Sequence, residues 1–144
     1  MPKLKQLITA LAILLSTSAV AQPDKDWWAC QYVESVGLIW ENGQWERTGF
    51  KNRPPFVLMS DGNGLLTKES VAKMFSNTSP APSIVVCSSE ITGHISCANP
   101  VGSSLFFNPY TANGGYSYTY GASQAQTDEI KDTVSVSAFE CTKG

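Results

Sequence analysis

Four cysteines limit what this chain can fold into more than any other feature of its sequence: Cys30, Cys87, Cys97 and Cys141. Their number is even, and no two of them form a C-x-x-C pair, which speaks against a redox motif or a zinc knuckle. The chain holds a single histidine, His94, so a zinc site also lacks its usual second ligand type. We therefore expect two disulfides, no metal and no cofactor.

The N-terminus predicts an oxidising destination. Lys3 and Lys5 precede an apolar stretch at 7–15, and Ala19-Val20-Ala21 matches the small-residue pattern that signal peptidase cleaves. The apolar stretch is shorter than the roughly 20 residues that cross a bilayer. The sequence thus predicts a signal peptide at 1–21, cleavage between Ala21 and Gln22, and a periplasmic or secreted single domain at 22–144 without a membrane span.

Short runs of β-branched and aromatic residues, separated by Gly, Pro, Asn and Ser, predict many short antiparallel strands. A helical pattern is present only at 67–77, where Thr67 can cap the helix and Val71, Met74 and Phe75 share a face. The remaining strands are expected at 27–34, 56–60, 104–108, 115–120 and 133–141. This all-β pattern with one short helix predicts a small disulfide-stapled barrel or sandwich, of which we favour the barrel.

The spacing of the cysteines predicts how they pair. If Cys87 and Cys97 lie opposite each other on a hairpin, the loop becomes Ile91-Thr92-Gly93, with glycine where a left-handed residue belongs. Cys30 and Cys141 then pair by elimination and join the first strand to the last. Four cysteines allow three connectivities, so the pairing Cys87–Cys97 and Cys30–Cys141 is a hypothesis.

A second hairpin is predicted at Asn42-Gly43, because this dipeptide accepts the positive φ angles of a type I′ turn. It sets Trp40 opposite Trp45, and the tryptophan face, which also holds Val36 and Leu38, is expected to point into the core. In the last strand, Val134 and Val136 alternate out of phase with Phe139 and Cys141, which predicts a β-bulge near Ala138.

Two groups of residues are candidates for function. Tyr116, Tyr118 and Tyr120 alternate along a predicted strand, so they form either an exposed binding platform for a protein or glycan or part of the core. His94, the only histidine of the chain and so the first candidate for acid–base chemistry, is placed beside Glu90 by the hairpin register, with serines on the same face. No G-x-S-x-G nucleophile motif accompanies this group.

Charge excludes one class of partner. After Lys3 and Lys5 are removed with the signal peptide, acidic residues outnumber basic ones, whereas nucleic-acid binding needs clustered Lys and Arg. The function expected from the sequence is a non-catalytic binding module, such as an inhibitor, an immunity-type protein or an envelope accessory protein. The alternative is a small secreted hydrolase that uses His94 with Glu90.

Four short segments spread over the chain carry a resemblance: Trp28-Ala29-Cys30, Asn42-Gly43-Gln44-Trp45, Val85-Val86-Cys87 and Phe139-Glu140-Cys141. In these segments the chain resembles short exported four-cysteine proteins of proteobacteria. The resemblance implies the fold class and the compartment, and it assigns no site residue.

Overall fold

The computed structural model describes residues 25–76, 84–127 and 132–144. The predicted signal peptide and its cleavage site at Ala21 and Gln22 lie outside these residues. The elements are β1 (Trp27–Glu41), β2 (Gln44–Gly49), β3 (Phe56–Met59), α1 (Lys68–Phe75), β4 (Val86–Ser89), β5 (Ile95–Ala98), β6 (Ser103–Asn108), β7 (Asn113–Tyr118), the 3-10 helix η1 (Tyr120–Ser123) and β8 (Thr133–Lys143). In the described segments, no helix has the length and apolar character needed to cross a membrane.

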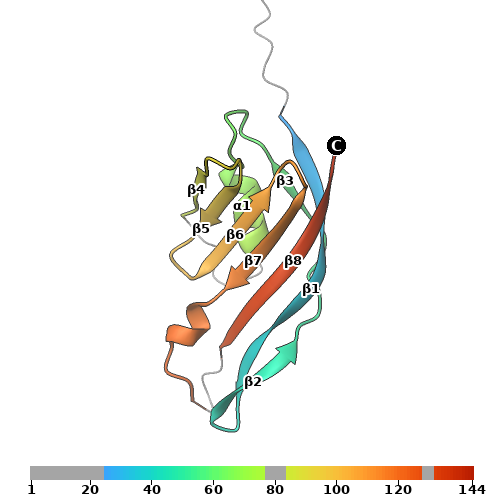
Figure 1. Ribbon diagram of the computed structural model, residues 1–144. Helices are drawn as coiled ribbons and strands as arrows, with labels where there is room; N and C mark the ends of the chain where they lie inside the picture. The colour runs from blue at the N-terminus through green and yellow to red at the C-terminus, as the bar shows by residue number, and fades with distance from the viewer. Residues whose placement is uncertain (1–24, 77–83, 128–131) are drawn as a thin grey trace, which may run out of the picture.

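The strands form one antiparallel sheet in the order β2-β1-β8-β7-β6-β5-β4, and β3 pairs with the N-terminal part of β1 (Figure 1). The predicted barrel is wrong, because β2 and β4 at the two ends do not pair with each other within the described chain. The first and last strands, β1 and β8, lie side by side in the middle of the sheet, as the predicted Cys30–Cys141 pairing requires, and strands from internal hairpins form its ends.

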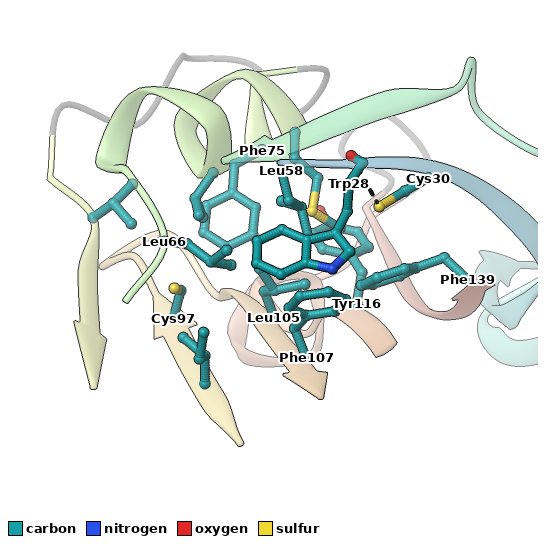
Figure 2. Close-up of a cluster of buried hydrophobic side chains, with 14 of the residues drawn as sticks. Trp28, Cys30, Leu58, Leu66, Phe75, Cys97, Leu105, Phe107, Tyr116 and Phe139 are labelled. Atoms are coloured by element: carbon teal, nitrogen blue, oxygen red, sulfur yellow. Dashed lines mark hydrogen bonds between the residues drawn. The ribbon is translucent and has the colours of Figure 1, made fainter. Parts of the chain in front are cut away.

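Helix α1 lies against one face of the sheet, and the core fills the space between them (Figures 1 and 2). We call this face the inner face and the opposite one the outer face. The helix begins where the sequence predicts, because the Thr67 hydroxyl accepts a hydrogen bond from the backbone N–H of Ser70. The most deeply buried large side chains come from the sheet and the helix together: Leu58, Val71, Phe75, Leu105, Phe107, Tyr116 and Phe139.

A β-bulge at Val33 decides which side chains of β1 reach this core. The register of β1 against β8 passes from Tyr32 opposite Phe139 to Glu34 opposite Ala138, so Val33 is an extra residue on β1. The side-chain amide of Asn52 donates to the carbonyl oxygens of Tyr32 and Val33, each at 3.3 Å. An extra residue reverses the alternation of a strand.

Even-numbered residues of β1 are therefore buried before the bulge, and odd-numbered ones point inward after it. Tyr32 is 8% exposed and Ser35 is 7% exposed, whereas Val36 is 47% exposed. The expectation that the tryptophan face points into the core is wrong for this reason. The bulge predicted near Ala138 is also misplaced: β8 alternates regularly, with Phe139 inside and Val136 outside, and the irregularity lies on the neighbouring strand.

Both predicted hairpins are present. Trp40 pairs with Trp45 around the Asn42-Gly43 turn, in which both residues have positive φ. In the second hairpin Ser88 pairs with Ser96, and Gly93 has a φ of 80°. The disulfides join Cys87 to Cys97 and Cys30 to Cys141, the pairs expected from the sequence. Disulfides of this kind indicate an oxidising compartment outside the cytoplasm.

Candidate functional site

The outer face of the sheet carries a band of large apolar side chains that no element of the described chain covers. We define the outer band by its residues on β1, β2 and β8: Val36, Leu38, Trp40, Trp45, Val134 and Val136. Val36 and Val136 are 47% and 53% exposed, and the other four are half-buried. Exposed apolar residues that are scattered singly are ordinary, but a contiguous group marks an interaction surface.

The strand register makes the outer band contiguous. Val36 lies opposite Val136, and Leu38 lies opposite Val134 across the β1–β8 pair. Opposite residues of an antiparallel pair have Cβ atoms about 4.5–5.5 Å apart, so these side chains touch. At the end of the band the rings of Trp40 and Trp45 meet edge to face, with centroids 5.5 Å apart.

Further along the outer face the surface becomes flatter. Ser117 lies opposite Val136, and Gly115 lies opposite both Ala138 on β8 and Phe106 on β6. Phe106 is 50% exposed and stands above these small neighbours. The apolar character of the outer band therefore continues across β7 to Phe106.

Few charges interrupt this surface. At the strand positions of the outer face, the ionised side chains of the described strands are Glu34 and Glu140 on one side of the band and Arg47 on the other. The lysines of α1, Lys68 and Lys73, belong to the opposite side of the molecule. The surface thus combines a neutral centre with a charged margin, as the buried centre and polar rim of protein interfaces do.

The three tyrosines singled out from the sequence do not share one exposed platform. Tyr116 is 1% exposed and belongs to the core, under the guanidinium of Arg53, whose central carbon lies 4.7 Å from the ring centroid. Tyr118 is half-buried and donates a hydrogen bond to Asp132 Oδ2 at 3.2 Å. Burial first, and then the Asp132 carboxylate, raise the pKa of Tyr118 to about 12. Tyr120 lies beyond β7, in η1, and is 41% exposed.

The ring of His94 is held by hydrogen bonds to an amide and a hydroxyl. Asn108 Oδ1 accepts from the backbone N–H groups of Tyr110 and Thr111, so its NH₂ group faces His94 Nε2 at 3.2 Å. An amide NH₂ group only donates, so Nε2 is the acceptor and the neutral ring carries its proton on Nδ1. That proton points to Thr92 Oγ1, 2.8 Å away.

This arrangement does not assemble the Ser/His/Glu group considered from the sequence. Glu90 and His94 are joined through their backbones: the Glu90 N–H donates a hydrogen bond to the His94 carbonyl oxygen at 2.7 Å. The other neighbour of the imidazole is Phe106, stacked at a centroid distance of 5.2 Å. Both ring nitrogens are engaged, and the geometry gives His94 the role of joining the β4–β5 hairpin to the turn after β6.

A cavity of about 390 Å³ opens between β3, α1 and the prolines before β3. Sequence reasoning missed this cavity because it depends on where the helix packs. It also missed the outer band, although the strands were predicted, because their inner and outer faces were exchanged by the bulge. A signal was present in the sequence, since Val134 and Val136 alternate out of phase with Phe139, and it was attributed to the wrong strand.

Comparisons with protein-family models, with curated proteins and with solved structures found no match to this chain. Within the described ranges, no three His, Cys, Asp or Glu side chains gather as a set that could hold a metal ion. Proposals about function therefore depend on the surface and the cavity themselves.

Proposed function

We propose that this chain is an exported, non-catalytic binding module whose outer band binds another protein in the periplasm or outside the cell. The observation that carries the proposal is the contiguity of the exposed and half-buried apolar residues of the outer band, on a sheet face that no described element covers. The function is that of an inhibitor, an immunity-type protein or an envelope accessory protein. All three act by covering a partner's surface and need no reactive group.

The composition of the outer band favours a protein partner over a glycan. Four of its six residues are Val or Leu, whose branched aliphatic surface gains stability from apolar contact and offers nothing for a sugar hydroxyl to bond. Tryptophan is enriched among the residues that contribute most to protein interfaces, and here Trp40 and Trp45 lie together at one end. The charged margin of Glu34, Glu140 and Arg47 would fix the orientation of the partner.

Site-specific photocrosslinking tests this proposal. A photoreactive amino acid at Val136 of the full chain, expressed in cells that export it, should yield a discrete crosslink to a protein. The same amino acid at Lys68, which is exposed on α1 and lies on the opposite side of the sheet, is the control and should not crosslink to that protein.

The crosslinked protein is then identified, purified and titrated with the chain. Val136→Lys removes apolar contact and places an unpaired charge in the interface, so we expect binding at least tenfold weaker. Lys68→Glu should leave binding unchanged. Equal crosslinking from positions 136 and 68, or a partner whose affinity does not respond to Val136→Lys, would overturn the proposal.

A further inference from the structure

We propose that the cavity between β3 and α1 binds an extended peptide, which adds to the edge of β3 that no described strand pairs with and inserts one apolar side chain. This site is separate from the outer band, and the inference does not depend on the function proposed for it. In Figure 1, α1 and β3 lie beside each other. The cavity is lined by residues of both elements, by the prolines before β3 and by Tyr32 of β1.

The walls of the cavity are mainly apolar. Its volume is about 390 Å³, within the usual range of ligand sites, and it is lined by Tyr32, Pro54, Pro55, Phe56, Val57 and Met59 on the strand side and by Met74 on the helix side. The helix also contributes Glu69, Ser70 and Lys73. Such a space takes one large apolar side chain together with part of the backbone that carries it.

The hydrogen bonds around β3 show which backbone groups face the cavity. The N–H of Met59 donates to Ser70 Oγ at 3.2 Å, and its carbonyl accepts from the Thr67 N–H at 2.7 Å. Both groups of Met59 thus point away from β1 and toward the helix. On a strand, the backbone groups of residues two apart point to the same side.

Val57, two residues before Met59, therefore turns its N–H and its C=O toward the cavity, away from β1. No residue of the described chain hydrogen-bonds to either group, and Val57 is 48% exposed. The N–H and the C=O of Val57 can bond to the C=O and the N–H of one residue in an added antiparallel strand. This is the geometry of peptide recognition by strand addition.

The positive charge of Lys73 on α1 favours a peptide that carries a carboxylate near Val57. Lys73 lies one turn beyond Glu69 on α1, and it lines the same cavity as Val57. The ammonium group of Lys73 makes no ion pair with a described residue. A carboxylate close to the inserted side chain complements it, either an acidic side chain or the C-terminus of the peptide.

The probe is the peptide acetyl-Thr-Val-Thr-Leu-Asp-amide with a fluorescent label, titrated with the oxidised full chain and followed by anisotropy. A second peptide ends in leucine with a free C-terminus, and a third ends in leucine amide and has no carboxylate. We expect the first or the second to bind at least tenfold more tightly than the third. Whichever binds identifies the source of the carboxylate.

Val57→Pro tests the hydrogen bond from the protein side. Proline lacks the N–H that faces the cavity, and the β1–β3 bonds do not use that group, so the strand persists. We expect Val57→Pro to weaken binding at least tenfold and Val57→Thr, which keeps the N–H, by less than twofold. Val136→Lys on the outer band should have no effect on the peptide.

A backbone N-methyl group on the leucine of the peptide removes the same kind of bond from the other side, without altering the protein. We expect this peptide to bind at least tenfold more weakly. Unchanged binding of the N-methyl peptide would overturn strand addition, even if Val57→Pro proved unfolded. Absence of binding by every peptide at millimolar concentration would also overturn the proposal.

Discussion

The two disulfides should differ in how much they stabilise the fold. The sequence separation is 111 residues for Cys30–Cys141 and 10 residues for Cys87–Cys97. A disulfide removes conformational freedom from the unfolded chain, and the loss grows with the logarithm of the loop that it closes. The two double variants, Cys30→Ala with Cys141→Ala and Cys87→Ala with Cys97→Ala, test this difference.

The chain-entropy relation gives about 4.8 kcal/mol for the long loop and about 2.7 kcal/mol for the short one, a difference of about 2 kcal/mol. Local packing does not account for this difference. Each bridge joins one fully buried cysteine, Cys30 at 2% or Cys97 at 1% exposure, to one half-buried partner. The cavities left by alanine are therefore similar in the two variants.

Urea unfolding, followed by tryptophan fluorescence and fitted with a separate m-value for each variant, measures the two losses. We expect the variant without Cys30–Cys141 to lose about 2 kcal/mol more than the variant without Cys87–Cys97. Equal losses, or a greater loss from the short loop, would refute the reasoning that loop entropy sets the ranking.

Two further predictions concern single residues. The pKa of Tyr118 is about 12 in the folded chain against 10.0 for the free group, so the stability that its neutral form contributes is complete below pH 10 and is lost as the pH rises toward 12. Absorbance titration of tyrosinate and unfolding experiments at pH 9–12 measure this loss. Asp132→Asn removes the carboxylate that helps to raise this pKa, so it should shift the transition to lower pH. Gly114→Ala should destabilise the fold by about 1–3 kcal/mol, because a Cβ would lie 2.6 Å from the Phe106 carbonyl oxygen and collide with the Phe139 ring. Gly115→Ala, whose Cβ would meet nothing closer than 3.7 Å, is the matched control and should cost less than Gly114→Ala in thermal unfolding.

Pairings between residues close in the sequence could be predicted because local geometry determines them. A two-residue Asn42-Gly43 turn leaves one register, which sets Trp40 opposite Trp45. A disulfide across a hairpin likewise fixes Cys87 opposite Cys97, and the loop length agrees with it. In both hairpins the turn or the disulfide fixes the strand register over a few residues, and the rest of the fold does not alter that register.

Which face is buried could not be predicted in the same way. That choice depends on Val33, the single extra residue in β1. Asn52 lies in the connection between β2 and β3, and its side-chain amide donates to the carbonyl oxygens of Tyr32 and Val33. Nothing in the residues around Val33 distinguishes a bulge from a regular strand. The β3–α1 cavity follows from the same kind of distant contact, so composition and spacing did not reveal it.

The position of β8 has a consequence for how the chain reaches its folded state. Before the last residues leave the ribosome or a translocation channel, strands β1 to β3 and strands β4 to β7 have no strand between them. Strand β8 joins these two sets as the central strand and brings Cys141 beside Cys30. The sheet is therefore continuous only with β8 in place, since β1 and β7 are each paired with β8 and not with each other in the described chain.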